Sequence, residues 1–569
     1  MLLALVLAAA LGAAGPSVHA QQGGSSSVER PGTAEKTASP GEKPAEKDDS
    51  ANAPNTPPAA AEEPPKGSPE IQPVLTRWRT YDLQGHPEFT FHIYDPYHQN
   101  ILKADYPLAG NWFLELSAFN NVTYKSRRNL DFRSVFADQI AAGKLKFVRH
   151  NQFVTENILF GAQIQHNDDT FVPANFRFRV NGVFDYKRDI NVLNSGSNGT
   201  SHLFDAFVEF ELHDFGGKQE GHSNFDLLFV RGGLQGFKSE FHGLIFNDVG
   251  AGGRLFGELK KNRLRYDFAY LKLFQKNPVS GFIDFSVPSG HQVAIARFSW
   301  DDLVLGWNSE WTFHYNRDHR TVSVSGSPSP LRANVDTFYG GATFNGHIGR
   351  FTFNPAIHAV FGHADAIVAG ATQRHSVAAW TALLDGEYKL DFWNFRLGYL
   401  YASGDANPSD KRDTGFDAIS DAVQLFGGPI SYWVGENIKF GKGDFVRANS
   451  LFPSFRGVNG AANYINPGLH AFNAGVDTTL SPRFDFSANF NFLAFAATGA
   501  YTNPIVIAHK PAGVEENAFL RWKPFLREAN QNVIFDFGFS VLHPQQGLRD
   551  AFGSGRTVFS TFLAFRLVY

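Results

Sequence analysis

Arginine and lysine side chains recur at alternate positions in stretches that are otherwise aromatic. Arg177 and Arg179 alternate with Phe176 and Phe178, and Lys187 lies further along the same stretch. Successive side chains of a strand point to opposite faces, so the cations share one face and the rings the other. Arginine stays charged and presents planar donors that match a carboxylate. The sequence therefore predicts a row of cations for anionic solutes, made of Arg177, Arg179, Lys187, Arg231, Arg263 and Arg265.

Acidic residues fall on the same face, which leaves a second interpretation open. They are Asp205, Glu209, Glu211, Asp226, Glu310, Asp385 and Glu387. In this interpretation, acids and bases pair across neighbouring strands and only line a wet wall. The 21–74 segment has 9 acidic and 5 basic residues, and the remainder of the chain's 55 acidic and 51 basic residues is evenly balanced. Net charge therefore does not decide between the two interpretations.

Oxygen-bearing side chains crowd one segment near residue 410. Asp405, Asn407 and Ser409 alternate there, and Asp413 follows. Ca²⁺ binds six to eight oxygen ligands, and alternating ligands are typical of calcium loops. The alternatives are a weak structural Ca²⁺ site and a solvated acidic loop. We expect no other cofactor.

Motifs for catalysis are not found. The sequence contains neither G-x-S-x-G nor H-E-x-x-H, and its 0 cysteines exclude disulfides and thiolate metal sites. The glycine-rich stretch 250–257 lacks the strand–helix setting of a nucleotide site. His314, Asp318 and His319 form a minor candidate for a zinc site at a loop entrance. We therefore expect neither an enzyme nor a nucleic-acid partner.

The elements that position these residues show the same two-residue period from about Asn111 to Tyr569. Long strands with one aromatic face and one charged face are typical of a transmembrane barrel with lipid outside and water inside. The fold class predicted is all-β, an antiparallel transmembrane β-barrel of about 18 strands (range 16–20). The strands are predicted at 111–124, 150–166, 174–187, 203–213, 225–236, 252–260, 263–274, 291–300, 303–316, 334–346, 350–362, 376–389, 393–402, 469–480, 484–496, 514–522, 532–542 and 557–569. A doubtful pair, Tyr432–Phe440 and Phe445–Leu451, would raise the count to 20; otherwise it belongs to a large loop.

Short and long connections alternate between these strands, as short periplasmic turns and long extracellular loops do in outer-membrane barrels. The long loops are predicted at 275–290, 316–334, 362–375, 496–514 and 542–556. A barrel of this size encloses an aqueous channel.

The rest of the chain divides into three segments. Residues 1–20 resemble a signal peptide, with an apolar run too short to span a bilayer. Residues 21–74, rich in Pro, Ala, Glu and Lys, cannot bury enough surface to fold, and they predict a disordered periplasmic tether. Residues 75–110 are either a periplasmic lead-in or a plug. The barrel is 111–569, and its aromatic end at Tyr569 resembles the signal read by the barrel-assembly machinery.

Three stretches resemble the alginate-export family of outer-membrane barrels: Arg231–Gln235, Arg254–Gly257 and Tyr399–Asp417. The resemblance covers roughly 111–569 and implies a monomeric 18-stranded channel that passes an anionic polysaccharide through an arginine-rich pore. We expect a channel or exporter in the Gram-negative outer membrane for a hydrophilic, anionic solute such as an acidic polysaccharide. The alternatives are a small-solute porin and a structural or adhesive barrel. The expected partners are outer-membrane lipid and lipopolysaccharide, the assembly machinery and periplasmic export proteins, with a monomer favoured over a trimer.

Overall fold

The structure is a computed structural model that describes most of the chain after residue 100. The described residues are 101–128, 151–167, 174–190, 197–214, 225–276, 283–304, 306–322, 330–368, 371–423, 425–435, 450–453, 462–499, 506–525, 533–552 and 555–569. The predicted signal peptide (1–20), the tether (21–74) and most of the 75–110 segment lie outside them.

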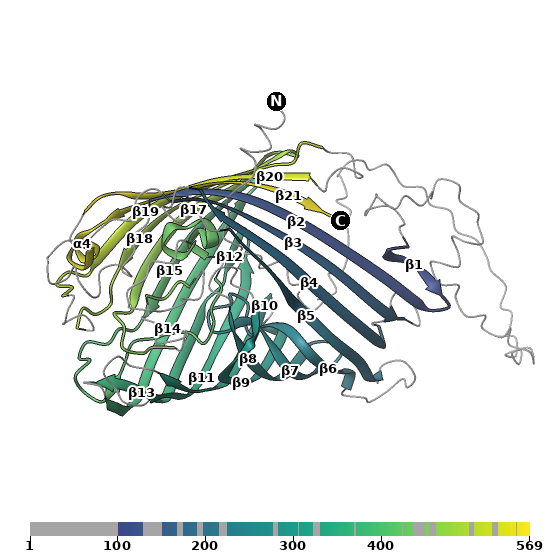
Figure 1. Cartoon of the computed structure of the whole chain (residues 1–569), viewed down its shortest axis with the longest axis horizontal. Coiled ribbons are helices and arrows are strands. Elements are labelled where there is room, and N and C mark those ends of the chain that lie inside the picture. The colour runs from purple at the N-terminus through teal and green to yellow at the C-terminus, as the bar shows by residue number, and fades with distance from the viewer. Residues whose placement is uncertain are drawn as a thin grey trace, which may run out of the picture. The chain divides into compact units, whose positions relative to one another are not determined.

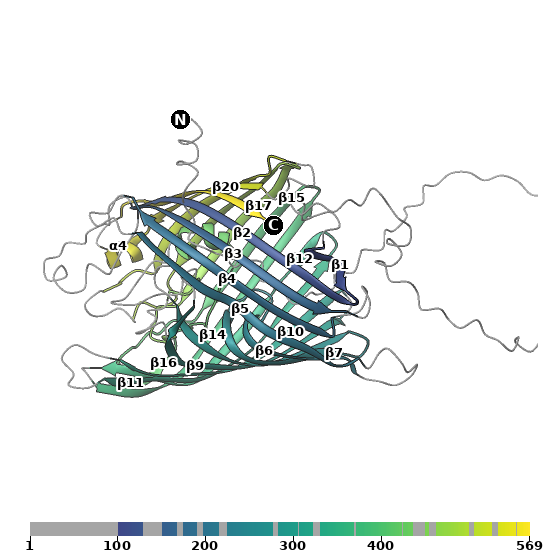
Figure 2. The same ribbon diagram turned by 45° about the vertical axis from the view of Figure 1, so that its right-hand side comes forward.

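Eighteen antiparallel strands form the wall of a closed barrel, which confirms the predicted fold class and strand number. Each strand pairs with the next along the chain, and the last pairs with the first. The wall strands are β2 (Trp112–Arg127), β3 (Asn151–His166), β4 (Phe176–Asp189), β5 (Ser197–Asp214), β6 (Phe225–Lys238), β7 (Asn247–Leu259), β8 (Leu264–Lys276), β9 (Ile283–Val304), β10 (Trp307–Val322), β11 (Leu331–Ile348), β13 (Ala356–Val368), β14 (Ala371–Leu390), β15 (Trp393–Ala402), β17 (Leu469–Ser481), β18 (Phe484–Ala494), β19 (Pro511–Trp522), β20 (Val533–Pro544) and β21 (Val558–Val568). Figure 1 shows the wall running from purple β2 to yellow β21, and Figure 2 shows the two strands side by side.

A short strand, β1 (Lys103–Ala109), covers the part of β2 that β21 does not reach. The register of β21 on β2 runs from Ser560 to Val568, and β1 pairs with the first residues of β2 on the same edge. The Lys103 ammonium donates to the carbonyl of Leu116 at 2.7 Å and lies 4.2 Å from the centre of the Tyr569 ring. The described end of the 75–110 segment therefore extends the sheet at the seam.

The predicted strand at 350–362 is interrupted. A three-residue strand, β12 (Phe351–Phe353), continues the line of β13 after a break at Asn354 and Pro355. Proline has no amide proton for the ladder, which makes it a natural break point. The Asn354 amide instead donates to the carbonyl of Asp385 at 2.7 Å, so the gap remains bonded to β14.

The predicted long loops at 275–290, 316–334 and 362–375 are wrong in their extent. Much of each belongs to strands that continue as paired hairpins, and β9 reaches 22 residues and β14 reaches 20. Only residues 277–282, 323–330 and 369–370 separate these strands. Strands β9, β11 and β14 are therefore much longer than the 11-residue strands β18 and β21.

The large connection between β15 and β17 folds into the barrel. It contains the two-residue strand β16 (Arg412–Asp413), parallel to β14, the 3₁₀ segment η1 (Leu425–Ile430) and the helix α3 (Tyr432–Gly435). A further helix, α4 (Gln546–Phe552), lies between β20 and β21. Of the two alternatives for Tyr432–Phe440, the structure supports the large loop, because the first residues are helical and buried. Residues 436–449, and with them most of the second candidate strand, lie outside the described residues.

The exterior of the barrel is apolar and aromatic, as the alternation predicted. On β10 the rings of Trp311, Phe313 and Tyr315 are exposed, whereas Thr312 and His314 between them are buried. Phe178 and Phe184 face outward on β4 in the same way. Among the described residues, no helix is both long and apolar enough to cross a membrane.

Candidate functional site

Five arginines line one part of the interior wall, on the strands from β4 to β9. This arginine wall consists of Arg177 and Arg179 on β4, Arg231 on β6, Arg254 on β7 and Arg297 on β9. Ladder register brings them together: Arg177 lies opposite Glu209, Glu209 opposite Arg231, and Arg231 opposite Arg254. The sequence prediction named three of these residues.

Three acidic residues pair with the arginine wall. Glu209 lies 3.1 Å from the Arg177 guanidinium and accepts from Arg231 Nε at 2.7 Å. Asp267 accepts from both Arg254 Nε and Arg297 Nη2 at 2.8 Å. Two of the three acids are therefore shared between two arginines.

The third acid, Asp205, lies 3.3 Å from the Arg179 guanidinium and accepts from the Asn181 amide at 2.9 Å. In these ion pairs, five arginines thus share three carboxylates. The charges pair across neighbouring strands, and a role of the arginines toward anionic solutes stays a prediction.

Aromatic rings inside the barrel support the arginines in the middle of the wall. The Arg231 guanidinium lies 4.3 Å from the Phe207 ring centre, and that of Arg254 lies 4.4 Å from Phe256. Phe229 stacks on Phe256 with a centroid distance of 5.4 Å. Cation–π contacts of this kind are strongest where water is excluded.

The backbones of β5 and β6 approach each other closely beside these rings and guanidinium groups. Gly233 has φ +137°, and a Cβ atom added there would lie 2.3 Å from the carbonyl of Ala206 on β5. Only glycine fits at that point of the β5–β6 ladder.

Access to water separates the five arginines into two groups. The side chains of Arg177, Arg179 and Arg297 are 24%, 32% and 22% exposed, whereas those of Arg231 and Arg254 are 10% and 6% exposed. The first three can offer donors to a solute in the lumen. The other two are held between acids and rings, where they order the wall.

The remaining predicted cations lie away from the arginine wall. Lys187 is near the long-loop end of β4, 4.0 Å from Asp189 and 4.9 Å from the Phe153 ring centre. Arg265 pairs with Asp301 at 2.5 Å near the short-turn end. Arg263 lies in the exposed turn before β8, so the structure places it at the rim and not within the wall.

The wall on β15 to β21 has a different chemistry. Four asparagines, Asn473, Asn489, Asn491 and Asn517, bond to one another or to Glu515 across β17, β18 and β19. The η1 segment closes over this asparagine wall, because Asn491 donates to the carbonyl of Phe426 at 2.8 Å. The Trp433 amide of α3 donates to the buried Glu515 carboxylate at 2.9 Å. The large loop is thereby attached to the interior face.

A second inward segment, residues 239–246 between β6 and β7, meets the large loop. The Ser420 amide donates to Ile245 O at 3.0 Å, and the Asn247 amide donates to Ser420 O at 2.7 Å. Leu244, Ile245 and Phe246 are buried there together with Phe416, Ile419 and Val423. An apolar core therefore occupies part of the barrel interior on the long-loop side.

Glu240 holds the 239–246 segment in its turn. Its buried carboxylate accepts from the amides of His242, Gly243 and Ile245 at 2.8, 2.9 and 3.0 Å. Burial raises the pKa of Glu240 to about 7, and the nearby Glu310 adds to the rise. Burial also lowers the pKa of His242 to about 4, so this imidazole is neutral at physiological pH.

The residues of the predicted calcium loop bond mainly to one another. Asp405 accepts from the Asn407 amide at 3.1 Å, Ser409 donates to Asn407 Oδ1 at 2.6 Å, and Asp413 lies 2.7 Å from His375. Among the described residues, no group of three His, Asp or Glu side chains is placed to hold a metal ion. The calcium site stays a prediction.

The three residues of the zinc candidate lie on opposite faces of β10 and of the barrel wall. His314 and Asp318 face the interior and are buried, whereas His319 faces outward and lies 2.7 Å from Asp336. Asp318 is engaged by Arg320 and lies 3.7 Å from His291. These three residues do not form one site.

Arg254 and Arg297 were missed by the sequence reasoning. Arg254 lies in a glycine-rich stretch without a clear two-residue pattern. Arg297 follows Val293 and Ile295, which share its interior face because the inward loops pack against them. One signal could have identified Arg297: the strand predicted at 263–274, next to its own, carries an acidic residue, Asp267.

Comparisons with known proteins found similarity only to solved structures, at low sequence identity. No protein-family profile matches the chain, and no curated protein matches it. OccAB4 of Acinetobacter baumannii is similar with a TM-score of 0.46 and 9% identity, over 80% of this chain and 97% of that chain. OccK2 (OpdF) of Pseudomonas aeruginosa has a TM-score of 0.44 and 10% identity, over 80% and 97%. A BenF-like porin from Pseudomonas fluorescens Pf-5 has a TM-score of 0.45 and 9% identity, over 79% and 97%.

Nothing in these comparisons supports the alginate-export family in particular. The assignment to a membrane rests on the strand pairing and on the exterior surface. Only helices and closed barrels satisfy every backbone hydrogen bond within lipid, and the exposed rings of the exterior suit hydrocarbon. The chain is a β-barrel protein of the Gram-negative outer membrane.

Proposed function

We propose that the protein is a passive channel for small hydrophilic solutes and that it favours anions such as carboxylates. The observation that carries the proposal is the arginine wall, where three guanidinium groups stay partly open to the lumen and five arginines share three carboxylates. A carboxylate passing this wall meets planar donors at fixed positions. Preorganised charge of this kind raises the local concentration of an anion.

Small solutes fit the channel better than a polysaccharide. The apolar core formed by the 239–246 segment and the large loop occupies the long-loop half of the interior. A hydrated, charged polymer needs a continuous wet path, and burying its charges beside apolar groups is costly. A solute of a few carbon atoms can pass the polar remainder beside this core. We therefore favour a small-solute porin over polysaccharide export.

The test replaces the three open arginines together, in the variant Arg177→Gln/Arg179→Gln/Arg297→Gln. Reversal potentials in a KCl gradient across planar bilayers should shift from anion toward cation preference. Liposome swelling in acetate should slow several-fold, whereas swelling in arabinose should change little. Arg374→Gln, which removes a half-exposed arginine from the exterior, is the matched control and should leave both measurements unchanged.

Equal reversal potentials in the triple variant and the native protein would contradict the anion preference. Permeation of long oligouronates as fast as acetate would contradict the size limit. The absence of any conductance would contradict the proposal that the protein is a channel.

A further inference from the structure

We infer that the exterior of β8 to β11 binds an acylated glycolipid that carries phosphate groups, of the lipid A class, at a specific site. This inference does not depend on the proposed transport function. It rests on an apolar furrow in the membrane-facing surface and on a group of cations at one end of it.

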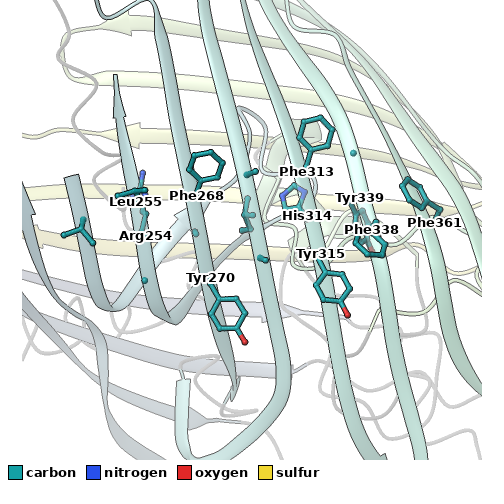
Figure 3. Close-up of a pocket in the computed structure, with 17 residues that line it drawn as sticks. Arg254, Leu255, Phe268, Tyr270, Phe313, His314, Tyr315, Phe338, Tyr339 and Phe361 are labelled. Carbon is teal, nitrogen blue, oxygen red and sulfur yellow. The ribbon is translucent and has the colours of Figure 1, made fainter. Parts of the chain in front are cut away.

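The middle of the furrow lies on β9 between two pairs of rings. Ala294 and Ala296 form its floor; in the ladder register, Tyr270 and Tyr315 flank the first, and Phe268 and Phe313 flank the second. Figure 3 shows these four rings as two pairs on two strands with another strand between them. The four rings are exposed on the exterior. Strands β8 and β10 are two ladder spacings apart, so the two pairs stand roughly 10 Å apart.

The hollow is large enough for acyl chains. Its volume is about 740 Å³, and it continues over Gly340 toward Phe338 and Phe361 on β11 and β13. The hollow therefore crosses several strands, and its apolar lining suits hydrocarbon chains. Methylene groups that fill the hollow gain dispersion energy from the atoms that line it.

Basic side chains lie at the long-loop end of the furrow. Lys272, Gln292 and Arg317 form the next row of the ladder beyond Tyr270, Ala294 and Tyr315. The Tyr270 hydroxyl donates to Gln292 at 2.8 Å and so marks the boundary between rings and polar groups. Lys272 and Arg317 are both exposed on the exterior.

More cations follow above this row. Arg332 is exposed on β11, and it lines a polar hollow of about 550 Å³ together with His319 and Arg320. Arg374 on β14 lies 3.5 Å from Asp336 and 4.0 Å from Asp365. We define the basic rim as Lys272, Arg317, Arg332 and Arg374, which outnumber the two acids in their midst.

A basic rim beside an apolar furrow matches one class of amphiphile. The long-loop end of a barrel faces the outer leaflet, so the rim lies at headgroup depth and the furrow at acyl-chain depth. Arginine and lysine are the preferred partners of phosphate. A phosphorylated, multiply acylated glycolipid presents its charges and its chains at these two levels, whereas a zwitterionic phospholipid lacks the net negative charge.

The experiment measures lipid binding by native mass spectrometry on the delipidated full-length barrel in detergent. The probes are bisphosphorylated hexa-acyl lipid A, the same lipid without phosphates, and phosphatidylethanolamine. We expect a 1:1 complex with the first, and binding at least ten-fold weaker with the other two. Lys272→Gln/Arg317→Gln should reduce lipid A binding about ten-fold, and Ala294→Phe, which fills the furrow, should do the same.

Two controls keep the result interpretable. Ala378→Phe adds a ring to the exterior of β14 outside the furrow, and Arg483→Gln removes an exposed arginine at the short-turn end. Both should bind lipid A like the native protein, and all variants should keep their heat-modifiable migration on gels. Equal binding of the three lipids, or unchanged binding in the furrow and rim variants, would overturn the inference. A lipid-free dimer that Ala294→Phe dissociates would overturn it in favour of a second copy of this chain.

Discussion

Arg254 and Arg179 carry the same charge on the same wall but have different tasks. Arg254 is 6% exposed, binds Asp267 through two of its nitrogens and lies over Phe256. Arg179 is 32% exposed and lies 3.3 Å from Asp205. Removing one member of a buried pair leaves the other charge without compensation, whereas exposed pairs contribute little.

Replacing Arg254 by alanine should therefore destabilise the barrel, by roughly 3 kcal/mol. Arg297 remains beside Asp267 and limits the loss. Arg179→Gln should destabilise the barrel less, because this side chain is more exposed and Asp205 keeps its hydrogen bond from Asn181. Urea titrations in lipid vesicles, followed by tryptophan fluorescence, measure both. Equal stability of the two variants would contradict the division of the arginines into two groups.

The raised pKa of Glu240 predicts that the position of the 239–246 segment depends on pH. A carboxyl with a pKa of about 7 when buried, and near 4.5 when the segment opens, favours the closed position most strongly below pH 4.5. That stabilisation falls as the pH rises toward 7, by roughly 3 kcal/mol in total. We expect more frequent open events in single-channel records at pH 8 than at pH 5.

Glu240→Gln should remove this dependence between pH 5 and pH 8. His242 does not contribute over that range, because its pKa of about 4 keeps it neutral. An unaltered pH response in Glu240→Gln would show that another group controls the segment.

At the level of elements, β1 protects the seam between the first and last strands. Without it, the first residues of β2 present unpaired backbone groups on the edge that β21 does not reach. Such groups are costly in or near lipid. The seam is also held by paired hydrogen bonds of 2.7 and 2.9 Å between Tyr569 and Ala118.

Deleting Lys103–Ala109 should leave a folded barrel that unfolds at a lower temperature. The measurement is the temperature at which gel migration changes from the folded to the unfolded form. Lys103→Gln is the milder companion variant, since it keeps the strand but weakens the contact with the Tyr569 ring. A deletion variant as heat-resistant as the native protein would contradict the role of β1.

Strands within the membrane could be predicted because their two faces meet different solvents. On β10, Trp311, Phe313 and Tyr315 face lipid while Thr312 and His314 face the interior. Above the membrane this contrast is lost. Arg317, Asp318, His319 and Arg320 are polar on both faces, so the sequence there reads as a loop although it is a paired strand.

The arginine wall was predicted only in part for a related reason. Alternation identified Arg177 and Arg179 because water lies on their side of the strand. It failed near Arg297, where Val293 and Ile295 share the interior face with the arginine. Those residues belong to a buried core shared with the inward loops, which come from other parts of the sequence, and no local pattern contains that information.

At the level of the whole molecule, the interior loops take up space inside the barrel. An 18-stranded wall encloses an aqueous channel, and here the 239–246 segment and the large loop occupy part of it. Replacing residues 405–465 by a short Gly-Ser linker should raise the single-channel conductance several-fold. It should also admit larger saccharides in liposome swelling. Unchanged conductance would mean that the large loop does not narrow the path.

The tall hairpins have a consequence for how the barrel can vary between relatives. Residues 356–368 of β13 pair with 371–383 of β14 in an unbroken register, joined by residues 369 and 370 alone. Adding or removing two residues in each strand would keep every remaining side chain on its face, whereas a change of one would exchange interior and exterior. The height of this side can therefore change in even steps during evolution while the pore beneath it stays the same.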